Sequence, residues 1–193
     1  MPRRRPKKII KTTDVAPRLR KALAKRAKGE LIDLLVELAK EDRRVLRQLD
    51  ARIDVEATPE ELAAATRQAI ADATAFDERD INSNFAYDYA AYEEVKRNLT
   101  RLVDRGQLRL AMELALELMD QGSEQVEMSD EGLMTQDIEE CLAVVTQALK
   151  RCDLPASEVI AWCAQMANRD RMGFIFEREL GAIRNHFESL RPR

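Results

Sequence analysis

The chain has few of the residues that mark turns and strand ends, with only 6 glycines and 6 prolines among 193 residues. Hairpin turns and strand boundaries draw heavily on both residue types, so their scarcity disfavours a β-rich fold. Charged residues make up 35% of the chain and hydrophobic residues 45%, a balance typical of amphipathic helices. The composition therefore predicts an all-α fold, and the chain is long enough to bury a core without a disulfide or metal.

Cysteines are also few, and three of them cannot all be paired. Cys141, Cys152 and Cys163 lie within or beside apolar helical stretches, where a free thiol behaves as a small buried hydrophobe. This usage fits a reducing compartment, so we expect a cytoplasmic protein. No segment approaches 18 uncharged apolar residues, and we expect neither a membrane span nor a secretory leader.

The sequence lacks the glycine-rich phosphate loops and the H-E-x-x-H zinc motif. The three cysteines recur every eleven residues and could be combined with His186 as four metal ligands. Structural zinc sites instead use pairs two to four residues apart, and Pro155 interrupts any helix shared by Cys152 and Cys163. We therefore expect no metal and no cofactor. His186, the only histidine, is expected at the surface because no activated nucleophile accompanies it.

Acidic residues gather between two predicted helices: Glu124, Glu127, Asp130 and Glu131. A calcium loop counted from Asp120 would need glycine where Gln125 stands, so a solvated acidic loop is expected. No catalytic residue is predicted, and we expect a protein that is not an enzyme. An enzyme whose side chains converge only in space is the third interpretation, after the two binding functions described below.

Charge is distributed unevenly along the chain. Residues 1–28 contain 12 basic residues and 1 acidic residue, a net charge of +11, whereas the rest contain 20 basic and 34 acidic residues, a net charge of −14. Residues 1–13 hold six of the cations with only Ile9 and Ile10 as apolar anchors. We predict a disordered basic arm over residues 1–13 and a single helical domain over residues 14–193. Such asymmetry favours an arm for a polyanion, or contact of the arm with the acidic body.

Six cations of the arm are the candidate nucleic-acid-binding residues: Arg3, Arg4, Arg5, Lys7, Lys8 and Lys11. Phosphate contacts would give affinity without base reading, and neutralising about six phosphates would give a salt slope near −5. No aromatic residue precedes Phe76, so base stacking by the arm is not expected. A solubilising or linker segment is the alternative interpretation.

Apolar spacing predicts about eight or nine helices joined in pairs. A basic helix is expected to begin near Asp14 or Pro17 and to end at Gly29, and a helix pair is expected to follow up to residue 53. Its first apolar stripe consists of Leu31, Leu34, Leu35 and Leu38. A capping box at Thr58, with Glu61 three residues later, predicts another helix start.

The middle of the chain predicts a helix that ends at Gly106 and a second that is apolar on nearly all sides, QLRLAMELALELMDQG. The second helix should be centrally buried, and the polar stretch SEQVEMSDEG after it is expected to be a connection. Antiparallel pairs of this kind predict an α-α superhelix with TPR-like or HEAT-like units.

The stretch NFAYDYAAYEE, residues 84–94, holds four of the nine aromatic residues. Helical spacing places Phe85, Tyr89 and Tyr92 on one apolar stripe, and Tyr87 falls off it. Tyr87 is therefore a candidate for lining a groove, because tyrosine is common at recognition surfaces. Trp162 lies on a stripe typical of a core and is the second groove candidate.

Three segments carry packing patterns rather than catalytic motifs: ELIDLLVELAKEDRRVLRQL, YDYAAYEEVKRNLTRLVDRGQLRLAMELA and MSDEG. They resemble the helical domain that accompanies SWIM-type zinc fingers, and its stand-alone bacterial relatives. The resemblance implies a superhelical scaffold and no reaction. The zinc finger itself needs Cys-x-Cys followed by Cys-x-His, and this chain has no such spacing.

These patterns lead to two expected functions. The first is a non-enzymatic scaffold that recognises a protein partner through its helical surface. The second is association with nucleic acid through residues 1–28. We expect no membrane partner, and the sequence leaves the oligomeric state open.

Overall fold

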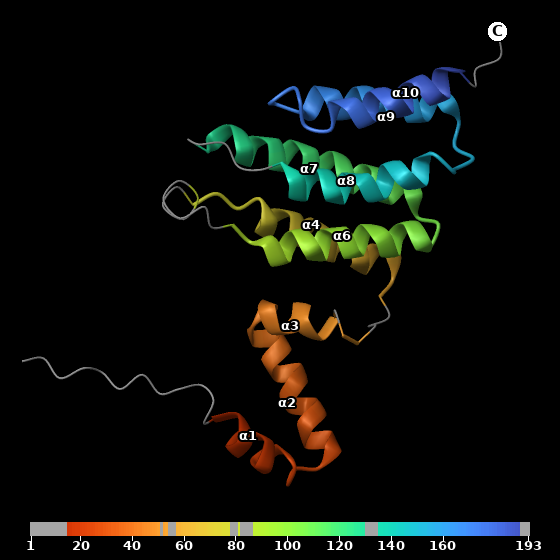
Figure 1. Ribbon diagram of the computed structural model, residues 1–193. Helices are drawn as coiled ribbons and strands as arrows, with labels where there is room; N and C mark the ends of the chain where they lie inside the picture. The colour runs from red at the N-terminus through yellow and green to blue at the C-terminus, as the bar shows by residue number, and fades with distance from the viewer. Residues whose placement is uncertain are drawn as a thin grey trace, which may run out of the picture. The chain divides into compact units, whose positions relative to one another are not determined.

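The computed structural model describes residues 15–50, 52–53, 57–77, 81, 87–129 and 135–189. All the regular structure among these residues is α-helical, in nine helices, which confirms the all-α fold class (Figure 1). The contacts divide the chain into two compact units, unit 1 (residues 1–55) and unit 2 (residues 56–193), which we describe separately. One domain over residues 14–193 stays a prediction, and the predicted disordered arm, residues 1–13, lies outside the described residues.

Unit 1 contains three helices: α1 (Val15–Leu23), α2 (Lys28–Glu41) and α3 (Arg43–Asp50). The prediction that the basic helix ends at Gly29 is wrong. The helix ends at Leu23, and Gly29 lies in the first turn of α2. A local cap explains the restart, because the Glu30 carboxylate accepts a hydrogen bond of 3.0 Å from the Ala27 backbone N–H.

Apolar side chains of unit 1 are largely exposed. The only buried residue among the described residues of its helices is Arg47. Leu34, Leu35 and Leu38 of the predicted stripe keep 41–43% of their surface accessible. The described part of unit 1 therefore has no apolar core of its own.

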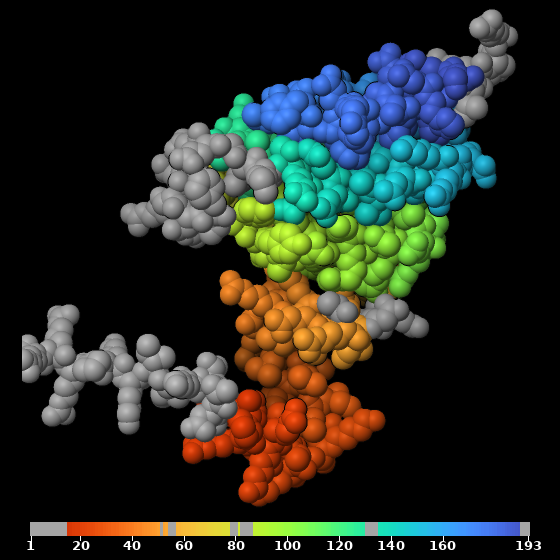
Figure 2. All heavy atoms as spheres, in the orientation of Figure 1, coloured from red at the N-terminus to blue at the C-terminus, as the bar shows by residue number. Residues whose placement is uncertain are grey.

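Unit 2 contains six described helices: α4 (Pro59–Ala73), α6 (Tyr89–Asp104), α7 (Leu108–Met128), α8 (Gln136–Leu149), α9 (Ala156–Arg169) and α10 (Glu177–Ser189). They form three pairs, α4 with α6, α7 with α8 and α9 with α10, which stack in two rows (Figure 1). Helices α4, α7 and α9 contact one another in succession along one row, and α6, α8 and α10 do so along the other. In the space-filling view the successive pairs lie directly against each other (Figure 2).

Two predicted helix boundaries are confirmed. At the start of α4, Thr58 Oγ1 accepts a hydrogen bond from the Glu61 N–H, and the Glu61 carboxylate accepts one from the Thr58 N–H. Just after α6, Gly106 adopts a φ of 72°, in the left-handed region that glycine tolerates best. The Gln107 N–H then donates to the Leu102 carbonyl, which closes the helix end.

Helix α7 is the central helix of unit 2, as its apolar composition predicts. It contacts α4, α6, α8 and α9. The expected polar connection after Gly122 is wrong, because α7 continues to Met128 and buries Gly122, Ser123, Gln125 and Val126. The Gln125 amide donates to the carbonyls of Ala73 and Ala75, and the Ser123 hydroxyl donates to the Arg169 carbonyl. Tertiary hydrogen bonds therefore stabilise a segment that looks like a loop in sequence.

Candidate ligand-binding groove

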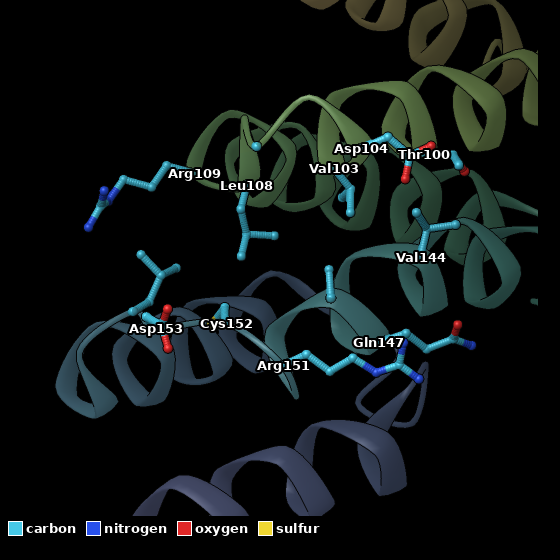
Figure 3. Close-up of a pocket in the computed structure, with 13 residues that line it drawn as sticks. Thr100, Val103, Asp104, Leu108, Arg109, Val144, Gln147, Arg151, Cys152 and Asp153 are labelled. Atoms are coloured by element: carbon cyan, nitrogen blue, oxygen red, sulfur yellow. The ribbon is translucent and has the colours of Figure 1, made fainter.

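A groove of about 900 Å³ lies at one end of the helix pairs of unit 2 (Figure 3). It is formed by the last turn of α6, the turn at Gly106, the first residues of α7, the last turns of α8 and the connection through Cys152–Leu154. We call it the α6–α8 groove. The tight left-handed turn at Gly106 returns the chain at once, so the end of α6 and the start of α7 form neighbouring walls.

Apolar side chains form the floor of the α6–α8 groove. Val103 and Leu108 point toward the opposite wall, which carries Val144 and Cys152 (Figure 3). All four are half-buried, and Leu154 adds apolar surface from the connection before α9. This floor can take up apolar side chains or the stem of a longer side chain.

Charged side chains of both signs line the rim. Arg109 forms a two-pronged ion pair with Glu158, with Nε–Oε1 and Nη2–Oε2 distances of 2.7 and 3.0 Å. These hydrogen bonds raise the pKa of the Arg109 guanidinium and lower the pKa of the Glu158 carboxyl. Arg151 and Asp153 are exposed at the edge of the groove. Asp104 at the end of α6 is also exposed in the lining, so the rim offers one cation and two anions to a ligand in addition to the paired arginine.

The cysteines are not gathered at one site. Cys152 lies half-buried in the α6–α8 groove, whereas Cys141 and Cys163 are buried in the core. Burial raises the pKa of the Cys141 thiol to about 12 and that of Cys163 to about 11, which keeps both protonated at neutral pH. His186 is exposed and its ring meets that of Phe187 edge to face. Among the described residues no group of three or more His, Cys, Asp or Glu side chains could hold a metal ion.

The two predicted groove residues lie elsewhere. Trp162 is only 4% exposed, and its indole N–H donates to the Met112 carbonyl at 2.9 Å, so it has no free ring face for a partner. Tyr87 is half-buried and donates a 2.5 Å hydrogen bond to Asp137. Burial, followed by this hydrogen bond, raises the pKa of Tyr87 to about 12. Neither side chain lines the α6–α8 groove.

The predicted aromatic stripe is wrong at two positions. Tyr89 is 56% exposed, whereas Tyr87 packs against the core and meets the Tyr92 ring edge to face at 5.9 Å. The cause is the helix start: Asp88 caps α6, so Tyr87 precedes the helix and does not follow its period. Tyr92 is buried as predicted, and Phe85 lies outside the described residues.

The acidic residues considered as a calcium loop are helical where they are described. Asp120, Glu124 and Glu127 share one face of α7, and Arg171 lies 3.9, 3.3 and 3.5 Å from their carboxylates. The guanidinium offsets part of their negative charge. Asp130 and Glu131 lie outside the described residues.

The basic segment is described only in part. The six candidate cations of the arm lie outside the described residues: Arg3, Arg4, Arg5, Lys7, Lys8 and Lys11. Of the cations that follow, Arg18, Arg20, Lys21 and Lys25 are exposed. Arg26 lies 3.8 Å from Glu30 in an exposed ion pair.

Comparisons with protein-family models, curated proteins and solved structures found no match to this chain. Among the described helices, none has the length and apolar character needed to cross a membrane.

Sequence reasoning missed the residues of the α6–α8 groove. In the sequence these residues look like ordinary positions of two amphipathic helices, with Thr100, Val103 and Asp104 in one helix and Gln147 and Arg151 at the end of the other. The available signal was Gly106, which predicts a sharp turn between two helices and hence a place where helix ends gather. Nothing in the sequence indicates that the end of α8 joins them.

Proposed function

We propose that this chain is a helical protein-interaction scaffold that binds a polypeptide segment of a partner in the α6–α8 groove. The observation that carries the proposal is the combination of an apolar floor with exposed charges of both signs on the rim. Protein interfaces have a similar organisation, with an apolar centre surrounded by a polar, solvated rim. An extended segment could bury apolar side chains against Val103 and Leu108 and place a carboxylate near Arg151.

We further propose that the two-row stack of unit 2 is a superhelix of TPR-like or HEAT-like pairs. Support comes from the succession of contacts along each row, and the resemblance to SWIM-associated helical domains implies the same kind of scaffold. The cytoplasm is the proposed location, because the described cysteines are all free thiols and two of them are buried in the core.

The test is partner capture from native extract with matched charge variants. Arg151→Glu reverses the charge of a groove residue, and Lys150→Glu makes the same change at the adjacent exposed residue, which does not line the groove. We expect Arg151→Glu to lower the recovery of a specific partner about tenfold, and Lys150→Glu to leave it within about twofold. Equal recovery of the partner with the unaltered protein and both variants, or recovery of no specific partner, would count against the proposal.

A second candidate function is association with nucleic acid through residues 1–28. It is favoured by the 12 cations of this segment and by the exposure of Arg18, Arg20 and Lys21. Binding to mixed-sequence DNA and RNA should then weaken with salt at a slope near −5 if about six phosphates are neutralised. Unchanged binding after deletion of residues 1–28 would exclude this function.

A further inference from the structure

Unit 1 has an apolar groove of about 560 Å³ between α2 and α3, which we call the α2–α3 groove. Its lining includes Ile32, Leu35 and Val36 from α2 and Leu46 from α3, with Ile53 just beyond α3. These side chains are between 43% and 56% exposed. They form a continuous apolar surface, in contrast to the isolated exposed apolar residues that are common on proteins.

Physical chemistry requires this surface to be covered. Helices α2 and α3 have 14 and 8 residues, and neither buries an apolar side chain in unit 1. Helices of this length are marginal in water unless tertiary packing stabilises them. Small scaffolds usually depend on oligomerisation, a metal or disulfides for stability; the described part of unit 1 has no apolar core, and unit 1 has no cysteine.

The charges around the α2–α3 groove indicate what covers it. Lys40 and Arg43 flank the turn at Asp42, whereas Asp50 lies at the other end of α3, about 10 Å farther along the helix axis. One end of the groove is therefore cationic and the other carries an anion. The acidic residues of α2 do not line the groove, so Lys40, Arg43 and Asp50 are the charges that a covering surface meets. Such a surface is complementary to itself when it is turned end for end.

We propose that a second copy of this chain covers the α2–α3 groove about a two-fold axis, so that the protein is a homodimer through unit 1. A two-fold interface uses the same patch on both subunits, and each residue pair occurs twice. Lys40 then faces the partner's Asp50, and α2 lies against α3 of the second copy. The four helices enclose the exposed leucine, isoleucine and valine side chains as a small bundle does. This inference uses different residues from the α6–α8 groove and is independent of the proposed function.

The first test measures the mass of the full-length protein by sedimentation equilibrium at concentrations up to about 100 µM, because dimer populations follow mass action. We expect a dimer, and we expect Leu35→Asp and Leu46→Asp each to raise its dissociation constant at least tenfold. Leu35 and Leu46 are exposed residues of unit 1, so their substitution removes nothing from the core of unit 2. Circular dichroism should therefore show that unit 2 still folds. The matched control is Phe174→Asp, which adds the same charge at a similarly exposed apolar residue of unit 2 and should leave dimerisation unchanged.

The second test exchanges charges between subunits. Lys40→Glu and Asp50→Lys should each weaken self-association about tenfold, because like charges then meet twice across the two-fold axis. Mixing the two variants should restore the dimer, since the carboxylates of one chain then meet the ammonium groups of the other. This rescue distinguishes a lost contact between copies from a variant that only disturbs α3.

Three results would overturn the inference. One is a monomer at every concentration, including a monomer whose α2–α3 groove is protected from hydrogen exchange by another part of the same chain. Another is a dimer that is unaffected by Leu35→Asp and Leu46→Asp. The third is the absence of rescue in the charge-exchange mixture.

Discussion

Gly122 lies within α7 at a point where a Cβ atom would press against the side chain of Ile138 in α8. A Cβ atom at this position would lie 2.8 Å from Cδ1 and 3.2 Å from Cγ1 of Ile138, which is itself buried. Glycine usually lowers helix stability relative to alanine, so its cost is offset here by the close approach of α7 and α8. Gly181 in α10 is the contrasting case, because a Cβ atom there would meet nothing within 4 Å.

We therefore expect Gly122→Ala and Gly181→Ala to have opposite effects. Gly122→Ala should lower the free energy of unfolding by about 1–3 kcal/mol, the usual cost of overpacking. Gly181→Ala should raise it by up to about 1 kcal/mol, because alanine is the better helix former. Urea unfolding followed by circular dichroism measures both, and a stabilised Gly122→Ala protein would contradict the packing argument.

Cysteine thiols and tyrosine hydroxyls with raised pKa values make the stability of unit 2 depend on pH in the alkaline range. Burial raises the pKa of Cys141 to about 12 and of Cys163 to about 11 from an ordinary value of 9.0. It also raises the pKa of Tyr87 to about 12 from 10.0, and that of Tyr92 above its ordinary value. The unfolded chain therefore releases these protons at a lower pH than the folded chain does.

The expected result is a fall in stability as the pH rises above about 9. Between the unfolded and folded pKa values the folded state holds more protons, so each thiol lowers the free energy of unfolding by up to about 1.4 kcal/mol per pH unit. Urea unfolding between about pH 8 and pH 10.5 should show this slope. A Cys141→Ala, Cys163→Ala double variant should show a shallower slope, whatever its stability at neutral pH. An equal slope in both proteins would mean that the thiols are not the source.

At the scale of single elements, the start of α4 is fixed by local chemistry. Thr58 and Glu61 satisfy each other's backbone amides at 3.2 and 2.8 Å, and Pro59 occupies the first helical position. The first four backbone N–H groups of a helix have no partner within the helix and otherwise need water or another acceptor. The capping box therefore sets the point where unit 2 becomes helical.

Thr58→Ala should lower the free energy of unfolding by about 1 kcal/mol, because it removes the acceptor for the Glu61 amide. Thr58→Ser keeps the hydroxyl and should lower the free energy of unfolding by no more than about half as much. Thermal unfolding of the three proteins gives the comparison. Equal losses for the serine and alanine variants would show that the methyl group, rather than the cap, stabilises this end.

At the scale of the whole molecule, the two units differ in how they are stabilised. Unit 2 buries a continuous core in which α7 contacts helices on several sides. The described part of unit 1 buries no apolar side chain. Stability in the two units should therefore depend on different contacts.

Residues 56–193 expressed alone should fold cooperatively, with a midpoint of thermal unfolding within a few degrees of the full-length value, because their core is complete. Residues 1–55 alone should gain helicity as their concentration rises, because their apolar surface needs a partner. Circular dichroism over a range of concentrations tests both fragments. A helical content of residues 1–55 that is independent of concentration would contradict the second expectation.

The sequence by itself determined the helical class, the paired helices and the boundaries at Thr58 and Gly106. Caps and left-handed glycines act within a few residues, and apolar periodicity reports which face of a helix is buried, so these features are readable locally. The same reasoning correctly identified α7 as the central helix. The same reasoning wrongly predicted that Tyr89 is buried and that Tyr87 lies off the core. An apolar stripe can be assigned correctly only when the first residue of the helix is known.

Only the tertiary structure decided which polar segments are buried and which helix ends meet. Gln125 can be buried because its side-chain amide forms hydrogen bonds with Ala73, Ala75 and Tyr92. These partners lie 33 to 52 residues away in the chain. The α6–α8 groove likewise joins residues from Thr100 to Leu154. Local sequence carries no information about such distant contacts, whose free energy depends on the packing of whole helices against one another.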